Sequence, residues 1–327
     1  MIDKLKSINV AVVIPSYKVK TFLKDVVLGL PEYINSIIVV DDKCPEESYT
    51  VAEGLDKVHV VRHEVNQGVG GALVSGYKKA LELEADIVVK VDGDGQMDPK
   101  YLLPLLEPLI GNIADYTKGN RFRDTEALKS MPGVRLFGNS VLSFLVKTAS
   151  GYWSIMDPTN GYTAIYRRAL EQLPLDSLDK RYFFESDMLI NLNIVDAVVK
   201  DVSMPAKYGD EESSLSVKKI IVDFPPKIIK GFAKRVKLKY FMYNFNAGSL
   251  YLAVGLPLLL LGIVNALIRL FSETNADTNM DMSIALPLIL GLQFLLQFLS
   301  LDIKAEPHKD LDIKISLLTK LSERLSD

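Results

Sequence analysis

Acidic and amide side chains are closely spaced in the DGDGQ segment, residues 92–96, which directly follows the apolar segment 87–91. Such an apolar segment is typical of a buried parallel strand, and open α/β sheets bind ligands where their strands end. Asp92 and Asp94 can share one hard cation, to which Gln96 adds a neutral oxygen. Mg²⁺ and Mn²⁺ prefer oxygen ligands, and Mg²⁺ usually keeps water and substrate phosphates in its shell. The three side chains are therefore predicted to bind Mg²⁺ or Mn²⁺ and, through it, a diphosphate.

The first part of the chain supplies the elements that would position these side chains. Apolar, β-branched segments recur at 10–14, 37–40, 58–61 and 87–91, and they alternate with helix-like stretches such as 70–83. This alternation predicts an α/β fold of Rossmann-like type, with a mostly parallel sheet and helices on both faces. The ends of these strands would form the ligand-binding edge.

Further candidates for ligand binding follow the first two expected strands. Pro15 and Tyr17 follow the first, and Asp41 and Asp42 follow the second. The two carboxylates could accept hydrogen bonds from ribose hydroxyls or from the edge of a base. The alternative for this pair is an ordinary helix cap, because an aspartate after a strand often caps the next helix.

A glycine-rich segment, NQGVGGA at residues 66–72, precedes an expected helix. Asn66, Gly68 and Gly70 are predicted to line the nucleotide end, since the glycines would allow close approach of a backbone or of a phosphate to the helix N-terminus. Neither G-x-G-x-x-G nor G-x-x-x-x-G-K-[ST] occurs in the chain. Dinucleotide dehydrogenases and P-loop enzymes are therefore disfavoured.

Composition narrows the class of protein further. The 327 residues suffice for one large domain or two smaller ones, and the balance of 38 basic against 41 acidic residues gives no indication of nucleic-acid binding. A single cysteine, Cys44, excludes an internal disulfide and a cysteine-rich metal site. Residues 1–9 lack a long apolar core, so no secretory signal is predicted.

Two uncharged apolar segments, 248–267 and 283–301, are each close to the length of a membrane-spanning helix. Basic residues such as Arg235 precede the first and lysines follow the second, whereas the linker between them is acidic. By the positive-inside rule, the N-terminal domain and both termini are predicted to be cytoplasmic. An integral membrane protein of two spans, in a bacterial inner membrane, is expected, and the spans leave room for a homo-oligomer.

The segment 217–245 mixes lysines with aliphatic and aromatic residues. The adjacent Pro225 and Pro226 are expected to divide it into two short amphipathic helices that contact membrane lipids, with two ordinary surface helices as the alternative. Apolar residues near helical spacing in 310–325 predict a further small amphipathic helix.

The ordered motifs VIPSY (13–17), VVDD (39–42), NQGVGGA (66–72) and DGDGQ (92–96) resemble those of family 2 glycosyltransferases with the GT-A fold. More narrowly, the chain is similar to polyprenyl-phosphate sugar transferases, which include dolichol-phosphate mannose synthases and bactoprenol glucosyltransferases, over about residues 8–215. The resemblance implies a UDP- or GDP-linked sugar donor, a divalent metal and inversion at the anomeric carbon. Lys18-Val19 departs from the Asn-Glu of many relatives.

The same resemblance assigns an acceptor end to the chain. Arg121 and Arg135 match arginines that bind the phosphate of the acceptor lipid in dolichol-phosphate mannose synthases, although Asn139 replaces the serine expected one helical turn after Arg135. Guanidinium groups suit a phosphate because they can bind it through two hydrogen bonds. A surface ion pair is the alternative for either arginine. The segment 208–214 resembles a loop that closes over the donor.

Three carboxylates in two further motifs complete the expected catalytic set. Asp157 lies in DPTNGY, and Glu185 and Asp187 lie in FFESD, both of which resemble acidic motifs of the family. A hydroxyl acceptor would need one of these three as a base, whereas a phosphate acceptor is already anionic, so that Asp157 could instead orient the acceptor or shape the metal site. For Glu185 and Asp187 the alternative is stabilisation of a helix N-terminus.

The leading hypothesis is an inverting, metal-dependent glycosyltransferase that moves a sugar from a nucleotide-diphosphate sugar to a polyprenyl phosphate at the cytoplasmic membrane face. Its expected parts are a catalytic domain (1–215), amphipathic interface helices (216–246), a transmembrane hairpin (247–303) and a cytoplasmic tail (304–327). A second hypothesis has a lipid-linked saccharide hydroxyl as acceptor, with Asp157 or Asp187 as the base. A third is a membrane subunit that binds nucleotide sugars without turnover.

Overall fold

The computed structural model describes residues 5–122, 133–205, 217–271 and 281–308. The expected tail helix in 310–325 and the loop 208–214 lie outside these residues. The chain divides into two units, one comprising residues up to Phe232 and one comprising Ala233–Glu306. Each unit is described by itself below.

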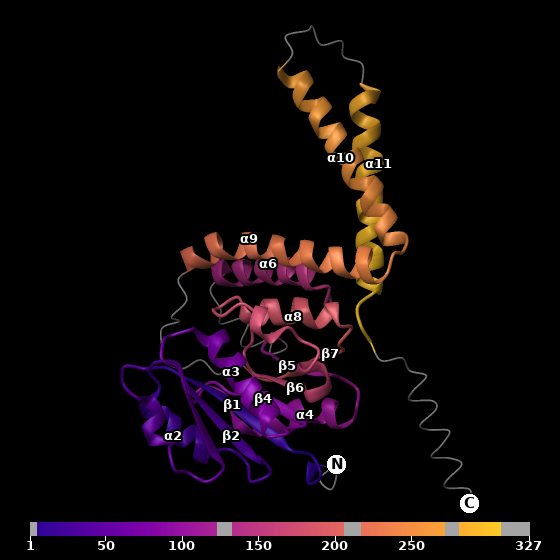
Figure 1. The fold of residues 1–327 in the computed structure, drawn as a ribbon. Helices are drawn as coiled ribbons and strands as arrows, with labels where there is room; N and C mark the ends of the chain where they lie inside the picture. The colour runs from indigo at the N-terminus through magenta and orange to yellow at the C-terminus, as the bar shows by residue number, and fades with distance from the viewer. Residues whose placement is uncertain (1–4, 123–132, 206–216, 272–280, 309–327) are drawn as a thin grey trace, which may run out of the picture. The chain divides into compact units, whose positions relative to one another are not determined.

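A seven-stranded mixed sheet forms the centre of the first unit (Figure 1), with strand order β3-β2-β1-β4-β6-β5-β7. All pairings are parallel except those of β6, which runs antiparallel to both β4 and β5. The four strands expected from the sequence are present as β1 to β4. The strands are β1 (Val10–Ser16), β2 (Ser36–Asp41), β3 (Val58–Arg62), β4 (Ile87–Lys90), β5 (Tyr116–Asn120), β6 (Thr163–Tyr166) and β7 (Val199–Ser203).

Helices cover both faces of this sheet, as predicted. The main apolar core lies between the sheet and two of them, because alternate β1 residues Val10, Val12 and Ile14 belong to one buried cluster with leucines of α2 and α4. On the opposite face, Gly76 of α3 packs against Val13. The helices of this unit are α2 (Lys20–Leu28), α3 (Val69–Glu82), α4 (Leu102–Ile110), α6 (Gly133–Ser150), α7 (Arg167–Leu170), α8 (Phe184–Ile194) and the first part of α9, with short 3₁₀ turns η1 (Ser48–Val51), η2 (Pro99–Tyr101) and η3 (Leu175–Ser177).

A row of polar side chains crosses the second face of the sheet. Lys90 of β4 and Lys118 of β5 are both paired with Thr163 of β6, and Lys118 is paired with Asp201 of β7. Residues paired across strands point to the same face, so the four form one transverse row. Both lysines are buried. This face therefore contains charged groups where the other face is apolar.

The expected break at Pro225-Pro226 is wrong, because the structure has one continuous helix, α9 (Val217–Val236), with both prolines inside it. A proline removes a backbone donor and crowds the preceding turn, which normally costs helix stability. Packing offsets this cost within the first unit, where the Phe224 ring lies 5.4 Å from that of Phe183. Gly231 lies directly against Ile190 of α8.

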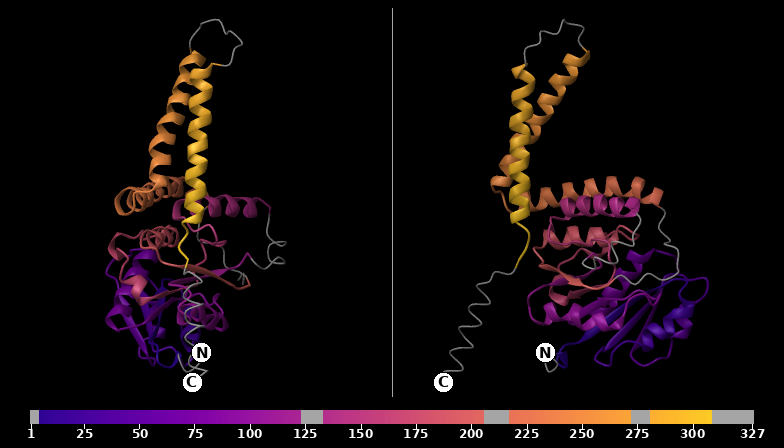
Figure 2. Two further views of the ribbon diagram at one scale, coloured as in Figure 1. Left: turned by 90° about the vertical axis from the view of Figure 1, so that its right-hand side faces the viewer. Right: turned by 180° about the vertical axis from the view of Figure 1, so that it is seen from behind.

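Two long apolar helices, α10 (Ala247–Phe271) and α11 (Met282–Lys304), make up most of the second unit. They lie side by side as a hairpin (Figure 2), and both are long and apolar enough to cross a membrane. Glycines allow their close contact: a Cβ at Gly291 would lie 2.5 Å from the backbone nitrogen of Leu259, and one at Gly262 would lie 2.7 Å from Leu288. Small residues at such contacts are typical of membrane helix pairs.

A buried ion pair joins the base of this hairpin to the preceding segment. Arg235 donates from Nη1 to Asp302 Oδ1 at 2.7 Å and from Nη2 to Oδ2 at 3.0 Å. The Tyr240 hydroxyl, in the π-helical turn η4 (Lys237–Tyr243), donates to the same Oδ1 at 2.7 Å. The sequence places Arg235 in a basic flank, but its side chain is only 1% exposed. The arginine therefore serves the packing of this unit.

Candidate functional site

The strand directions bring Asp92, Arg121 and Asp157 to one edge of the sheet. Asp92 follows β4 and Arg121 follows β5, whereas Asp157 precedes β6, which runs in the opposite direction. The ends of β4 and β5 and the start of β6 therefore coincide. The predicted donor and acceptor motifs thus meet at the edge that the sequence indicates.

The DGDGQ segment forms a tight loop at this edge. Gly95 has a φ of 75°, which favours glycine, and Asp94 Oδ1 accepts a hydrogen bond from the Gln96 backbone nitrogen at 3.0 Å. The side chain of Asp92 is 33% exposed. Within the described residues, no group of three or more His, Cys, Asp or Glu side chains is arranged to hold a metal. Two carboxylates and an amide on one loop instead fit a metal whose shell is completed by phosphates and water.

Lys90 is a charged residue of this site that the motif analysis missed. Its Nζ lies 3.2 Å from Asp92 Oδ1 and 2.9 Å from Glu185 Oε1, and its side chain is 4% exposed. Burial opposes the charged form, but the carboxylates of Asp92 and Glu185 outweigh it and raise the pKa of Lys90. A lone lysine in the otherwise apolar strand IVVK is the signal that would have identified it.

At the nucleotide end, Asp42 binds its own chain through both carboxylate oxygens. Oδ1 accepts from the Gln67 backbone nitrogen and Oδ2 from that of Gly68, each at 2.7 Å. His63 Nδ1 lies 2.8 Å from Oδ1, and the Asn66 amide donates to the Asp42 carbonyl at 3.0 Å. Asp42 thus holds the glycine-rich loop in place, together with His63 directly after β3.

The neighbouring residues at this end differ in their exposure. Asp41 is 4% exposed and accepts a hydrogen bond from the Cys44 backbone nitrogen at 3.3 Å, and burial raises the pKa of its carboxyl group. Pro15 belongs to β1, and Tyr17 follows that strand with 45% of its surface exposed. Among these three residues, Tyr17 is the side chain most accessible to a ligand.

Gly68 and Gly70 pack against another part of the protein backbone. A Cβ at Gly68 would lie 2.5 Å from the carbonyl oxygen of Lys180, and one at Gly70 would contact that of Asp179. The Gly71 backbone nitrogen donates to the Lys180 carbonyl at 3.1 Å. Of the two explanations that the sequence left open for these glycines, approach of a backbone is the one observed. Donor contact by Gly68 and Gly70 stays a prediction.

At the acceptor end, Arg121 and Asp157 form a bidentate ion pair. Arg121 donates from Nε to Asp157 Oδ2 at 2.7 Å and from Nη2 to Oδ1 at 3.1 Å. The Asp157 side chain is fully buried, whereas that of Arg121 is 37% exposed. A buried carboxylate therefore orients a guanidinium that remains accessible from the solvent. Arg135 lies in α6, but the side chains of Arg135 and Asn139 lie outside the described residues.

The other two predicted carboxylates also have partners. Glu185 binds Lys90, and Asp187 Oδ2 accepts from the Asp179 backbone nitrogen at 2.8 Å. Both lie in the first turn of α8, as the helix-end alternative predicts. The structure thus brings Glu185 to the DGDGQ loop, whereas Asp187 holds the turn before α8.

Two further buried ionisable groups lie behind the acceptor end. Lys118 donates from Nζ to the Asn160 carbonyl, and burial lowers the pKa of Lys118 to about 8. Burial raises the pKa of Asp201 to about 6, and its Oδ2 accepts from the Met156 backbone nitrogen and the Asn120 amide, each at 2.8 Å. The sequence motifs pointed to neither group. Both belong to the transverse polar row, which is a product of strand register.

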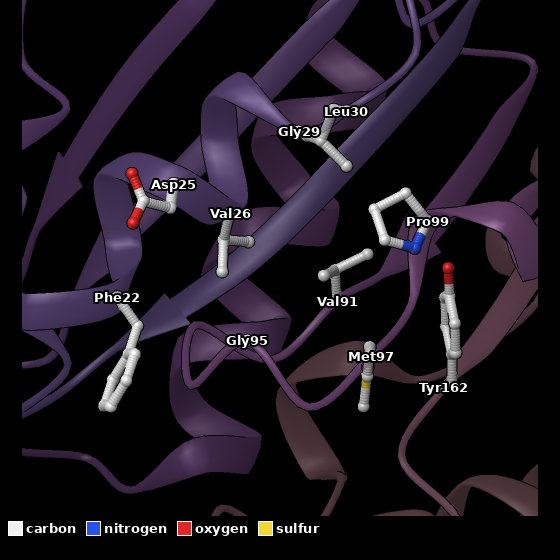
Figure 3. A pocket seen from close by; sticks show the side chains of 10 residues that line it. All are labelled: Phe22, Asp25, Val26, Gly29, Leu30, Val91, Gly95, Met97, Pro99 and Tyr162. Atoms are coloured by element: carbon white, nitrogen blue, oxygen red, sulfur yellow. The ribbon is translucent and has the colours of Figure 1, made fainter. Parts of the chain in front are cut away.

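A cavity of about 340 Å³ lies beside the DGDGQ loop (Figure 3). Val91, Gly95 and Met97 line it from the loop, and Tyr162 and residues of α2 line its other sides. The lining is mostly apolar, with the Asp25 carboxylate at one end and the Tyr162 hydroxyl at the other. Neither Asp92 nor Asp94 contributes to it, so it is distinct from the predicted donor site.

Comparison with known proteins identifies similar sequences over the same region. The model of the family described as glycosyl transferase family 2 matches residues 11–174, half of the chain. A UDP-N-acetylglucosamine–dolichyl-phosphate N-acetylglucosaminyltransferase of Methanococcus voltae is 33% identical over 62% of this chain and 87% of its own length. A polyprenol monophosphomannose synthase of Mycolicibacterium smegmatis is 32% identical over 46% of this chain and 59% of its own length.

Among solved structures, the fold is similar to that of glucosyl-3-phosphoglycerate synthase from Mycobacterium tuberculosis, which was determined with Mn²⁺ and UDP. The TM-score is 0.52 at 18% identity, over 72% of this chain and 84% of that one. This likeness concerns the fold alone. It confirms the expected GT-A type of the seven-stranded unit.

Proposed function

The chain belongs to glycosyl transferase family 2, and from this premise we propose that it transfers a sugar from a nucleotide-diphosphate donor to a polyprenyl phosphate. The relatives named above act on dolichyl or polyprenol phosphates, according to their names. The structural observation that carries the proposal is Arg121, whose accessible guanidinium is oriented by the buried Asp157 at the edge that also holds the DGDGQ loop. An anionic phosphate is the natural ligand of such a group.

Donor binding is assigned to the loop that follows β4. Asp92, Asp94 and Gln96 would hold Mg²⁺ or Mn²⁺, and a bound metal would neutralise the donor's diphosphate and stabilise the nucleoside diphosphate as it leaves. The exposed ring of Tyr17 offers a surface for the base or ribose. Asp41 and Asp42 act here mainly by supporting the surrounding loops, since Asp41 is buried and Asp42 binds the backbone of residues 67 and 68.

Transfer would occur by a single displacement. A phosphate oxygen of the lipid, positioned by Arg121 and by Arg135, forms a bond to the anomeric carbon as the bond from that carbon to the diphosphate breaks, and the configuration inverts. The acceptor is anionic at neutral pH, so no base is required and catalysis depends on positioning and on electrostatic stabilisation.

The contacts of Asp157, Glu185 and Asp187 favour a phosphate acceptor over the hydroxyl of a lipid-linked saccharide. Such an acceptor needs a carboxylate that can accept its proton. Asp157 instead binds Arg121 through both oxygens, Glu185 binds Lys90, and Asp187 binds the backbone of Asp179. All three carboxylates are therefore held by other groups of the protein, and none is placed as a free proton acceptor for a hydroxyl.

Two apolar helices of membrane-spanning length are consistent with a membrane-embedded lipid acceptor. We assign residues 1–215 to catalysis, 216–246 to the membrane interface, 247–303 to the membrane hairpin and 304–327 to a tail, with the catalytic domain at the cytoplasmic face. This orientation rests on the distribution of basic residues around the spans. The bacterial inner membrane and a homo-oligomer stay predictions.

A donor and acceptor screen tests the proposal. Membranes containing the chain are incubated with polyprenyl phosphate, Mn²⁺ or Mg²⁺ and radiolabelled UDP- or GDP-sugars, and label entering the organic phase is counted. One donor should give label that requires the metal, is lost in Asp94→Ala and falls at least about a hundredfold in Arg121→Gln. The control variant is Arg167→Gln, which removes a surface arginine paired with Glu171. Equal loss in both arginine variants, or label without added metal, would contradict the proposal.

A further inference from the structure

Lys90 lies at the meeting point of three segments that are far apart in the sequence. Its Nζ is 3.2 Å from Asp92 of the DGDGQ loop and 2.9 Å from Glu185 at the start of α8. The third segment is the DPTNGY loop, since a Cβ at Gly161 would contact Lys90 Nζ and lie 3.1 Å from Asp92 Oδ2. The ammonium and the Asp92 carboxylate are therefore covered together by the Gly161 backbone.

The environment of this ammonium differs from that of a surface ion pair. The Lys90 side chain is 4% exposed and that of Glu185 is 14% exposed, whereas that of Asp92 is 33% exposed. The lysine thus contacts one enclosed carboxylate and one carboxylate that reaches the surface where the donor is proposed to bind. An ion pair in such a setting has a fixed geometry, because breaking it would leave an uncompensated buried charge.

We propose that Lys90 is a positioning residue for the metal and diphosphate site. This inference rests on the proposed function, and it gives Lys90 two roles. The first is to hold Asp92 Oδ1, so that this carboxylate would offer the metal a constant orientation. The second is to connect the donor loop to α8 through Glu185, so that the loop after β4 and the start of α8 keep one relative position. Partners of metal ligands commonly determine affinity in this way.

This role makes a prediction that a purely structural role does not make. Lys90→Met should destabilise the protein, because Glu185 becomes a largely enclosed carboxylate without its cation. Adding Glu185→Gln should restore most of that stability, because the uncompensated charge is then gone. The double variant still lacks the group that orients Asp92, so its metal affinity should remain low.

The experiment uses the full chain in detergent and measures two quantities for each variant. Apo stability is taken from the thermal midpoint, and Mn²⁺ binding is taken from the EPR signal of free Mn²⁺ with UDP or GDP present, against a protein-free blank. Lys90→Met and the double variant should both bind Mn²⁺ about tenfold more weakly or worse. The matched control is Lys78→Met, which removes an exposed lysine paired with Asp176 on the surface.

The thermal midpoint and the Mn²⁺ affinity of each variant together test the role of Lys90. The proposal is supported if the double variant recovers stability but not Mn²⁺ affinity. It is overturned if affinity returns with stability, or if Lys90→Met binds Mn²⁺ as tightly as the wild type. A parallel transfer assay on the wild type keeps this result separate from the proposed function: absence of lipid-linked sugar would refute the acceptor assignment, whereas the Mn²⁺ comparison would still test Lys90.

Discussion

Lys118 lies in β5 and Arg121 follows this strand directly. The positive charges of the two side chains are compensated in different ways. Arg121 is paired with the buried carboxylate of Asp157 and retains an accessible face. Lys118 is fully enclosed and donates to the Asn160 carbonyl, in the same row as Asp201. The first arrangement presents a charge to a ligand, whereas the second places a charge inside the protein at a cost in stability.

For the first arrangement, we expect Asp157→Asn to weaken acceptor use selectively. The amide keeps the shape of the side chain but offers Arg121 one neutral acceptor in place of two charged ones, which loses orientation and about 1–3 kcal/mol. The KM for polyprenyl phosphate should rise about tenfold or more, with little change in the KM for the sugar donor. Steady-state kinetics with each substrate varied in turn measures both. A rise confined to the donor KM would contradict the assignment of Arg121 to the acceptor.

The enclosed position of Lys118 is tested by the pH dependence of the free energy of unfolding. The pKa of Lys118 is lowered to about 8 in the folded state, against about 10.4 in an unfolded chain. Between these values the unfolded chain binds more protons, so the free energy of unfolding should rise with pH, by roughly 3 kcal/mol at most. Lys118→Met should lack this rise. Denaturation of wild type and variant from pH 7 to pH 10 measures the difference, and parallel curves would refute the lowered pKa.

At the scale of elements, the glycine-rich loop 66–72 shows how far sequence reasoning reached. A helix was predicted directly after this segment, but α3 begins earlier, at Val69, so that residues 69–72 form the first turn of the helix. Its packing partner, the backbone of residues 179 and 180, lies more than a hundred positions away in the chain, and no local pattern indicates such a contact. Close approach of a backbone was one of the two roles expected for these glycines, but the approaching segment was not predicted.

Gly70→Ala tests this packing. The added Cβ would contact the Asp179 carbonyl oxygen and lie 2.8 Å from the carbonyl carbon of Lys180, which should cost about 1–3 kcal/mol of stability. Gly138→Ala is the control, because the residue is inside α6 and, among the described residues, no atom beyond the local helix backbone lies within 4 Å of a Cβ there. The control should gain about 0.5–1 kcal/mol. Thermal midpoints that fall equally in both variants would contradict the proposed close contact.

In the second unit, the ion pair of Arg235 and Asp302 should be the main polar contact that fixes the base of the hairpin. Asp302→Asn leaves the buried guanidinium without its counter-charge and should cost about 3–5 kcal/mol. Asp281→Asn provides the control, since Asp281 caps the other end of the same helix and asparagine is an equally good cap. Thermal unfolding of the full chain in detergent distinguishes them. Equal midpoints for the two variants would show that the pair contributes little.

At the scale of the whole molecule, the first four strands, the helix after the glycine loop and the two apolar helices followed from periodicity and length. The later strands did not, because β6 (TAIY) and β5 (YTKGN) lack the aliphatic, β-branched runs found in the first four strands. The row formed by Lys90, Lys118 and Asp201 depends on how these later strands are paired. The predicted site was therefore located by its motifs, whereas its buried charges required the complete sheet.

Transfer of the sugar to the phosphate of a polyprenyl lipid distinguishes the proposed function from its alternatives. The most direct measurement is mass spectrometry of defined lipids after incubation with the purified chain, the active nucleotide sugar and Mn²⁺, with polyprenyl phosphate, polyprenol and a lipid-linked saccharide supplied separately. Only polyprenyl phosphate should gain the mass of one sugar residue, with release of one nucleoside diphosphate per product. A mass gain on the lipid-linked saccharide, with polyprenyl phosphate unchanged, would contradict it.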